Sequence, residues 1–433
     1  MRDFATSSDP AVQRQLDRLG ALSVPEGRLG LETIHKLLAR LGDPHDSLPP
    51  AFHVAGTNGK GSTCAFLRAM LEADGKRVHV TTSPHLVRYN ERIRVAGELI
   101  SDERLAAVLA EVLDAGEELS PSFFEVTIAA AFLEFARVPA DACVIEVGLG
   151  GRFDATNVLP HPAACGIATL GLDHERFLLA PEKDTPAEPL ARIAFEKAGI
   201  VKTGCSLVTQ SYPEGPTLEI ERAAIAAGAP LAMRGQQWEA EATDLGLHYQ
   251  DRDGALALPL PTLPGLHQAD NAALAVAMLR HQDFVSVGRD AMARGIRAAR
   301  WPARLQRLSP GPLVGDREVW LDGGHNPDAG AMLARHFAGR RFHLVIGMLA
   351  NKNPAALLGS LAFGVESAIA VPVPRHEHHG SKSFGEAIKR AIDNAPGLHE
   401  AFDKLPDDGL PVLIAGSLYL AGEVLKLNEE LPD

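Results

Sequence analysis

The stretch that most constrains the fold is VAGTNGKGST at residues 54–63, where an apolar, strand-like run is followed by three closely spaced glycines, a lysine and hydroxyl side chains. Glycines let a backbone turn tightly and approach an anion without clashes from Cβ atoms. A helix that starts here points its first N–H groups at the anion, and Lys60 adds a mobile positive charge. The stretch therefore predicts a phosphate-binding loop. Its predicted contacts are Gly56, Thr57, Asn58, Gly59, Lys60, Gly61 and Ser62.

This loop departs from a standard Walker A sequence, in which Ser or Thr follows the lysine directly. Gly61 stands at that place, and the first glycine of the standard pattern would fall at Val54. The structural alternative is a glycine-rich turn that binds nothing. The preceding strand and a following helix that ends at Gly75 favour a shortened phosphate loop.

The length and the patterning of the chain predict two α/β domains. A chain of 433 residues exceeds the usual size of one hydrophobic core. Nearly continuous apolar strands alternate with helical segments, which is typical of a parallel sheet covered on both faces. We place a phosphate-loop parallel-sheet domain at residues 1–300 and a smaller α/β domain at 301–433. Residues 203–262 are less regular, and we expect strands and short helices there.

Composition narrows the function classes. The net charge of −13 argues against a nucleic-acid binder, which normally shows a basic face. No run approaches the ~20 apolar residues of a membrane span, and the N-terminus lacks the apolar region of a signal peptide. The four cysteines show no metal-like spacing and read as free thiols. We therefore expect a cytoplasmic protein, and a monomer because no coiled-coil pattern or exposed apolar stripe is evident.

Polar residues stand where predicted parallel strands end, which is where such sheets place their sites. Glu146 follows a buried run, and a carboxylate there suits Mg²⁺; the alternative is a solvated strand-end residue. Asp173 and His174 follow the next strand, and Ser83 follows the strand after the phosphate-loop helix. A lone histidine is more often structural than a ligand, but its place beside a phosphate loop favours function.

Ten short motifs carry a family resemblance, in order from about residue 29 to residue 424: GTNGKGS, TSPHL, SFFE, EVGLGGRFDATN, LDH, EKAGI, HQADNAALA, WPARLQ, DGGHNP and GSLYLAGEV. Together they resemble folylpolyglutamate synthase/dihydrofolate synthase of the Mur ligase superfamily. The resemblance implies a Mur ligase-like fold, with a P-loop ATP-binding domain followed by a Rossmann-like glutamate-ligase domain. It also implies that ATP phosphorylates a carboxylate and that the amino group of glutamate attacks the acyl phosphate.

The resemblance further implies residue roles and cofactors. Lys60, Lys197 and His325 would be catalytic, with Lys197 carbamylated, whereas its structural alternative is a lysine that interacts with the last carbonyls of its helix. Mg²⁺ would be held by Ser83, Glu146 and His174, and a monovalent cation is allowed. Further nucleotide contacts would be Asn271, Arg304 and Asp322, and glutamate would meet His325 and Ser417.

The acceptor site follows from the same resemblance. Phe124 would stack on a pterin ring, with plain core packing as its alternative. Asp154 would accept hydrogen bonds from the aminopyrimidine edge. The full predicted pterin/folate set is Leu29, Gly30, Leu31, Glu32, Ser122, Phe123, Phe124, Glu125, Phe153, Asp154 and Ala155. This set favours activity on both dihydropteroate and reduced folates.

One segment departs from the family pattern, because residues 175–192 are longer than the usual connection and lack its glycine. Insertions settle in loops, so we expect an enlarged surface loop beside the metal site. Three other functions stay open: a folylpolyglutamate synthase only, another amide ligase of the Mur superfamily, and a P-loop regulatory ATPase that acts through a partner protein.

Overall fold

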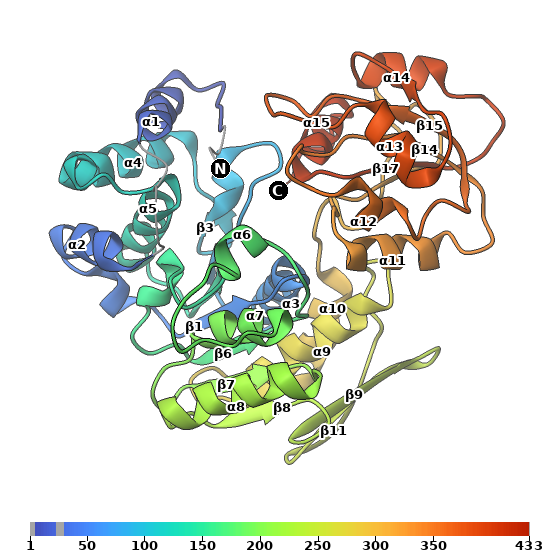
Figure 1. Cartoon of the computed structure of the whole chain (residues 1–433). Helices are drawn as coiled ribbons and strands as arrows, with labels where there is room; N and C mark the ends of the chain where they lie inside the picture. Colours follow the sequence, from blue (N-terminus) through green and yellow to red (C-terminus); the bar gives the residue numbers. More distant parts are fainter. Residues whose placement is uncertain (1–4, 23–29, 433) are drawn as a thin grey trace. The chain divides into compact units, whose positions relative to one another are not determined.

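The computed structural model describes residues 5–22 and 30–432, and the chain divides into two compact units (Figure 1). Unit 1 is made of Met1–Pro84, Arg88–Thr262 and Gln268–Ala299. Unit 2 is made of His85–Val87, Leu263–His267 and Arg300–Asp433. The two short segments of unit 2 therefore lie within stretches of sequence that otherwise belong to unit 1.

Unit 1 is built on an eight-stranded sheet with the order β4-β3-β2-β5-β1-β6-β7-β8. Pairing is parallel from β2 through β8, and β3 and β4 add an antiparallel edge. The predicted parallel-rich α/β sheet is confirmed. The strands are β1 (Ala51–Ala55), β2 (Val78–Thr81), β3 (Ile93–Val95), β4 (Glu98–Leu99), β5 (Ala142–Glu146), β6 (Ala164–Ile167), β7 (Ser206–Thr209) and β8 (Leu231–Met233).

Helices cover both faces of this sheet, as the side chains of β6 show. Cys165 and Ile167 share a buried cluster with residues of α7 and α8, whereas a Cβ atom on Gly166 would lie 2.3 Å from Met278 Sδ of α9. Alternate residues of one strand thus face different helices. The helices of unit 1 are α1 (Pro10–Ala21), α2 (Glu32–Arg40), α3 (Lys60–Ala73), α4 (Asp102–Gly116), α5 (Phe123–Arg137), α6 (Glu175–Leu178), α7 (Pro189–Ala198), α8 (Glu214–Ala227), α9 (His267–Arg280) and α10 (Arg289–Ala298).

The less regular region after residue 203 contains more order than the sequence indicated. The expectation of short helices there is wrong, because α8 has 14 residues. After a first turn that contains Gly215 and Pro216, residues 218–227 are good helix formers, and Ile220 and Ala224 pack in a core cluster of unit 1. The strands β9 (Trp238–Thr243), β10 (Gly246–Asp251) and β11 (Gly254–Leu258) form a separate antiparallel sheet.

The predicted end of the phosphate-loop helix at Gly75 is confirmed. α3 ends at Ala73, Asp74 caps it, and Gly75 follows with φ +81°. Gly75 N–H donates to Glu72 O at 2.9 Å, and the next N–H donates to Leu71 O at 3.1 Å. This pair of bonds is the Schellman arrangement, which favours glycine at the left-handed position.

Unit 2 has a six-stranded sheet with the order β12-β13-β17-β14-β15-β16, antiparallel only between β12 and β13. Alternate residues of β17 face two separate cores: Val412 and Ile414 pack with α14 and α15, while Leu413 and Ala415 pack with α11, α12 and α13. The strands are β12 (Gln306–Arg307), β13 (Val319–Leu321), β14 (Phe342–Ile346), β15 (Val365–Ala370), β16 (Asp393–Asn394) and β17 (Val412–Ala415). The helices are α11 (Pro327–His336), α12 (Pro354–Leu358), α13 (Ser381–Ile388), α14 (Leu398–Lys404) and α15 (Leu418–Leu427).

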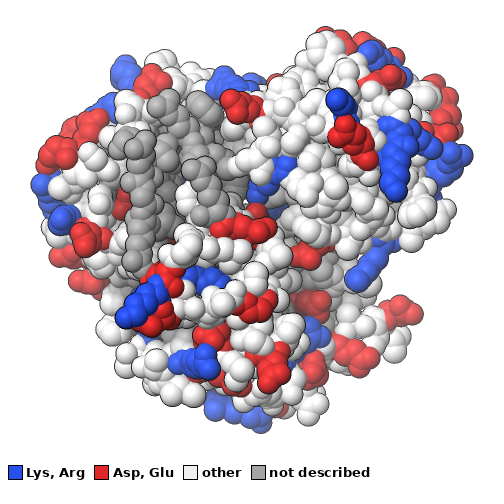
Figure 2. All heavy atoms as spheres, viewed as in Figure 1, with Lys and Arg blue, Asp and Glu red and all other residues white. Residues whose placement is uncertain are grey.

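Figure 2 shows acidic and basic side chains interspersed over the face in view. All four cysteines are free and buried, as predicted. In the part of the chain that the structure describes, no helix has both the length and the hydrophobicity to cross a membrane.

Candidate active site

The predicted phosphate loop lies between β1 and α3 in unit 1. β1 ends at Ala55 and α3 begins at Lys60, so GTNG forms the turn, and Gly61 and Ser62 are buried in the first turn of the helix. Gly59 has φ +83°, and a Cβ atom on it would lie 2.4 Å from Asn271 Oδ1. Only glycine fits at this position. The predicted nucleotide contact Asn271, from α9, is therefore brought directly beside the loop.

Hydrogen bonds to the segment after β6 hold the loop in place. Thr57 N–H donates to Thr169 O at 2.8 Å, and its Oγ1 donates to Gly171 O at 2.9 Å. Lys60 Nζ donates to Gly56 O at 3.0 Å and to Thr57 O at 3.3 Å. The lysine thus folds along the loop, where a phosphate group would compete for its ammonium.

Lys197, the lysine of the EKAGI motif, contacts the same loop. Its Nζ, at the C-terminal end of α7, donates to Gly56 O at 2.9 Å, and the side chain is buried. Burial, together with the nearby charge of Lys60, lowers the pKa of Lys197 to about 7, while Asp173 and Asp154 act in the opposite direction. The structural alternative for this lysine, a bond to the last carbonyls of its own helix, does not describe this contact.

Two of the three predicted metal ligands lie together. Glu146 is buried at the end of β5, and its Oε2 accepts a hydrogen bond from Ser83 N–H at 3.1 Å. His174 precedes α6, with Nε2 3.8 Å from Asp173 Oδ2. Among the described residues, no group of three or more His, Cys, Asp or Glu side chains is placed to hold a metal ion. A site here would therefore need hydroxyl, phosphate or water oxygens as well, which suits Mg²⁺.

Phe124 and Asp154, the two central pterin candidates, meet at Gly148. A Cβ atom on Gly148 would lie 2.5 Å from the Phe124 ring and 3.1 Å from Asp154 Oδ2. Asp154 is buried and accepts hydrogen bonds from Leu149 N–H at 2.8 Å, Thr156 N–H at 3.0 Å and Thr156 Oγ1 at 2.5 Å. Burial raises the pKa of Asp154, and these hydrogen bonds oppose the rise. An aromatic ring and a carboxylate are thus held side by side.

Three other predicted acceptor residues make contacts that stabilise the fold and would account for them without a ligand. Ser122 and Glu125 form a reciprocal capping box at the start of α5, and the Phe123 ring lies 5.7 Å from the Tyr89 ring. Their assignment to ligand binding stays a prediction, as does that of Gly30, Leu31, Glu32, Phe153 and Ala155. Leu29 lies outside the described residues.

In unit 2, the predicted Asp322 follows β13 and is buried. It accepts hydrogen bonds from Leu305 N–H at 2.8 Å and Gly324 N–H at 2.7 Å. Burial raises the pKa of Asp322, and the charges of Arg304 and His325 oppose that rise. The predicted residues Arg304, Asp322 and His325 are therefore close enough to interact electrostatically.

Ser417 lies near these residues because β13 and β17 are neighbours. Leu321 pairs with Ile414 in parallel register, so Asp322 and Ser417 both follow the carboxyl ends of adjacent strands. A Cβ atom on Gly323 would lie 2.2 Å from Leu418 Cδ2, which places the two strand-end loops in contact. Ser417 Oγ caps α15 by accepting from Tyr419 N–H at 3.1 Å.

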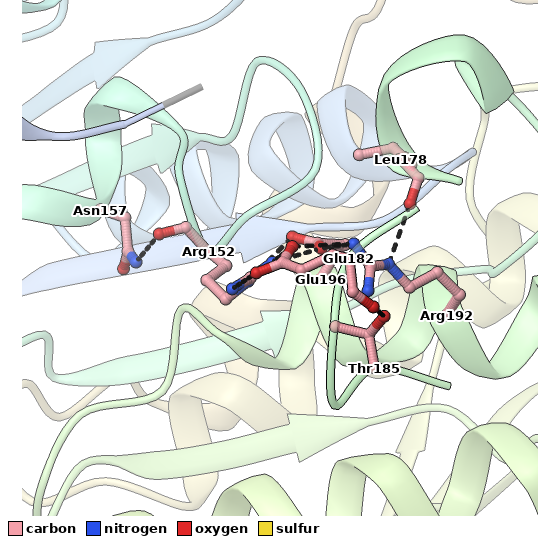
Figure 3. Close-up of polar contacts among 7 residues, drawn as sticks. All are labelled: Arg152, Asn157, Leu178, Glu182, Thr185, Arg192 and Glu196. Atoms are coloured by element: carbon pink, nitrogen blue, oxygen red, sulfur yellow. Dashed lines mark hydrogen bonds and ion pairs between the residues drawn. The ribbon is translucent and has the colours of Figure 1, made fainter. Parts of the chain in front are cut away.

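Four charged residues that were not predicted from the sequence form a cluster beside Lys197: Arg152, Glu182, Arg192 and Glu196 (Figure 3). Two of them stand inside quoted motifs, Arg152 in GGRFDATN and Glu196 in EKAGI. Their motif positions could have indicated a function, whereas Glu182 and Arg192 lie outside all ten motifs.

Comparisons with known proteins extend this picture. No protein-family model matches the chain. The dihydrofolate synthase/folylpolyglutamate synthase of Escherichia coli is 35% identical and covers 92% of this chain and 91% of its own length. The folylpolyglutamate synthase of Lacticaseibacillus casei is 32% identical and covers 90% and 92%.

Solved structures agree with these relatives. E. coli FolC in complex with DHPP and ADP has a TM-score of 0.85 at 32% identity and covers 98% of both chains. A bifunctional folylpolyglutamate synthase/dihydrofolate synthase with Mn, AMPPNP and L-glutamate bound has a TM-score of 0.83 at 30% identity, covering 98% of this chain and 99% of its own.

Proposed function

The chain belongs to the dihydrofolate synthase/folylpolyglutamate synthase family, and we propose that it is an ATP-dependent ligase that joins L-glutamate to dihydropteroate and to reduced folates through an acyl phosphate. The observation that carries the proposal is the contact of Lys197 with Gly56 of the phosphate loop. This contact brings α7 to the loop that would bind the phosphates of ATP.

The chemistry requires activation of a carboxylate. A carboxylate is a poor electrophile, and phosphorylation gives it a good leaving group. The loop N–H groups and Lys60 stabilise negative charge on the transferring phosphoryl group. No side-chain nucleophile is needed, because the amino group of glutamate attacks the acyl phosphate and displaces phosphate. The protein then contributes orientation and electrostatic stabilisation.

We propose that the divalent cation is Mg²⁺ and that Ser83, Glu146 and His174 hold it. The buried Glu146 carboxylate beside Ser83 supports this assignment. The bound ion supplies further charge neutralisation at the phosphates. Lys197 has a lowered pKa and is therefore substantially neutral near pH 7, which is the form that reacts with CO₂ to give a carbamate.

Asp154 and Phe124 would receive the acceptor. A carboxylate beside an aromatic face matches a flat heterocycle that carries adjacent N–H donors. We therefore propose the bifunctional enzyme and name Asp154 as the pterin contact. A folylpolyglutamate synthase without dihydrofolate synthase activity is the second candidate, because one relative of similar identity carries that name alone.

We propose that unit 2 binds glutamate. Arg304 and Asp322 are its proposed nucleotide contacts. His325 and Ser417 are the proposed glutamate contacts. The convergence of Asp322 and Ser417 at adjacent strand ends supports this division.

We also propose that all partners are small molecules, with no nucleic acid, and that the protein acts as a monomer in the cytoplasm. The buried free cysteines fit a reducing compartment. The large exposed apolar side chains are spread over several elements, with Leu218 and Ile225 on α8 and Phe363 after α12. Sedimentation of the protein at micromolar concentration tests the monomer.

The function is tested by ADP release with ATP, Mg²⁺ and glutamate, comparing dihydropteroate with tetrahydrofolate. Turnover with both acceptors is expected. Turnover with tetrahydrofolate alone would leave the ligase and discard the role of Asp154. ADP release that is indifferent to acceptor and glutamate would instead favour a regulatory ATPase.

A further inference from the structure

The loop that carries Asp154 lies directly against the end of α7 that carries Lys197. A Cβ atom on Gly151 would lie 2.7 Å from Glu196 O and 3.0 Å from Lys197 Cα. One on Gly199 would lie 2.5 Å from Arg152 Cβ. Arg152 N–H donates to Glu196 O at 2.7 Å. Gly151 and Gly199 allow the two backbones to approach this closely. Because they are in direct contact, we expect a movement of the loop at residues 148–154 to be transmitted to the end of α7.

The side chain of Arg152 extends this backbone contact into the cluster of Figure 3. Its Nη2 lies 2.8 Å from Glu196 Oε1 and 2.6 Å from Glu182 Oε2, and its Nη1 lies 3.2 Å from Glu182 Oε1. Asn157 also links the two segments, because its Nδ2 donates to Arg152 O at 2.9 Å and to Gly199 O at 3.0 Å. Arg152 Nε also donates to Glu196 Oε2 at 3.2 Å. Glu182 and Glu196 are thus both bidentate partners of Arg152, a geometry that orients a guanidinium strongly.

Arg192 closes the cluster from α7. Its Nη2 lies 3.1 Å from Glu182 Oε2 and 3.0 Å from Glu196 Oε1, and its Nε donates to Leu178 O at 3.0 Å. The side chains of Arg192 and Glu196 are only 6% and 7% exposed. Two guanidiniums are matched by two carboxylates. Without Glu182, a single buried carboxylate would have to serve both cations, and like-charge repulsion would separate them.

Glu182 comes from the segment between His174 and α7. Thr185 fixes its backbone, because Thr185 Oγ1 donates to Glu182 O at 2.7 Å. The segment is mostly exposed, yet this one carboxylate turns inward to the cluster (Figure 3). The ion pairs of Glu182 therefore attach this segment to Arg152 and Arg192.

We propose that Glu182 is a positioning residue for the ligase reaction. By completing the charge cluster, it sets the acceptor loop at residues 148–154 and Lys197 in a fixed mutual arrangement. This inference rests on the proposed function, because it assigns Asp154 to the acceptor and Lys197 to the phosphate side. It adds to that function a residue supplied by the segment between His174 and α7.

The test compares Glu182→Gln with Asp184→Asn, which removes a charge from an exposed side chain two residues away in the same segment. Hydrogen exchange at residues 148–154 and 179–188 and steady-state kinetics are measured for each variant, well below the unfolding temperature. Glu182→Gln is expected to speed exchange in both segments, to raise the KM of the acceptor and to lower kcat, each by about tenfold. Asp184→Asn should match wild type.

Thr185→Val is the second variant, because it keeps every charge and loosens only the backbone of Glu182. It is expected to shift the same quantities in the same direction by about threefold. Kinetic constants within twofold of wild type in both variants would overturn the proposal, even if their melting temperatures fell, because that result describes a purely structural cluster.

Unchanged exchange at residues 148–154 in Glu182→Gln would also overturn it, whatever the kinetics. Exchange does not depend on turnover. If wild-type protein ligated no glutamate, the proposed function would fail separately, and unchanged exchange would still reject the role of Glu182 in holding the loop.

Discussion

Replacing Lys197 by methionine is expected to stabilise unit 1 while abolishing ligation. The side chain is buried and is held in an environment that disfavours its charge. Methionine has a similar shape and no charge. Gly56 O keeps a hydrogen-bond donor in the variant, because Lys60 Nζ also reaches it at 3.0 Å.

The magnitude follows from the pKa of Lys197, which is lowered from 10.5 to about 7. Each pKa unit corresponds to about 1.4 kcal/mol, so the folded state disfavours the charged lysine by about 5 kcal/mol. At pH 7 the folded lysine is half neutral, and the net destabilisation is about 4 kcal/mol. The lost hydrogen bond offsets about 1 kcal/mol, so Lys197→Met should raise the free energy of unfolding by about 3 kcal/mol.

The destabilisation caused by Lys197 decreases as the pH rises. Because the folded pKa lies below the unfolded value, the destabilisation is fully present below about pH 7 and fades as the pH approaches 10.5. Urea unfolding is measured by circular dichroism in CO₂-free buffer at pH 7 and pH 9.5, with the exposed Lys183→Met as the control. If Lys197→Met is no more stable than wild type at pH 7, or if its added stability does not shrink at pH 9.5, then the buried lysine does not destabilise the folded state as predicted.

Three further predictions concern the site. Lys60→Ala should lower ligation by about 10³-fold, measured as ADP release, with unchanged circular dichroism; near-normal activity would reject the phosphate loop. Gly59→Ala should raise the KM of ATP at least about tenfold, since the new Cβ atom would lie 2.4 Å from Asn271 Oδ1 at φ +83°; an unchanged KM would reject this close contact. Asp154→Ala should damage the dihydropteroate reaction more than tetrahydrofolate extension, and equal losses would mean that Asp154 is no dedicated pterin contact.

The features that the sequence predicts best are local. The phosphate loop needs only a strand, a glycine-rich turn and a helix in succession, and all three are continuous in sequence. The end of α3 at Gly75 is equally local, because the left-handed position and its two hydrogen bonds involve neighbouring residues. The parallel strands also follow from runs of apolar residues that need no knowledge of their partners.

Long-range pairings are what the sequence does not reveal. Arg152 and Glu182 are 30 residues apart, and no sequence pattern in either segment indicates that the two side chains pair. The same holds for His85–Val87: Leu86 O would lie 1.9 Å from a Cβ atom on Gly422, so this strand-end segment packs in unit 2. Such contacts depend on tertiary packing, which overrides local pattern.

The length of residues 175–192 predicted a surface loop, which is correct only for residues 179–188: these are irregular and mostly exposed, whereas α6 occupies Glu175–Leu178 and α7 begins at Pro189. The sequence could not show that Glu182 turns inward, because a charged residue between prolines and other charged residues reads as solvated. The buried guanidinium of Arg192, which balances Glu182 and Glu196, becomes visible only when α7 is folded.

In the proposed reaction, ATP drives amide formation through an acyl phosphate on the folate-type acceptor. The most direct test supplies dihydropteroate labelled with ¹⁸O in its carboxylate, together with ATP, Mg²⁺ and glutamate, and analyses the released phosphate by mass spectrometry. One ¹⁸O atom in each phosphate, matched by one glutamate added to the acceptor, is the predicted result. Unlabelled phosphate, or ATP hydrolysis without a glutamylated product, would contradict the account.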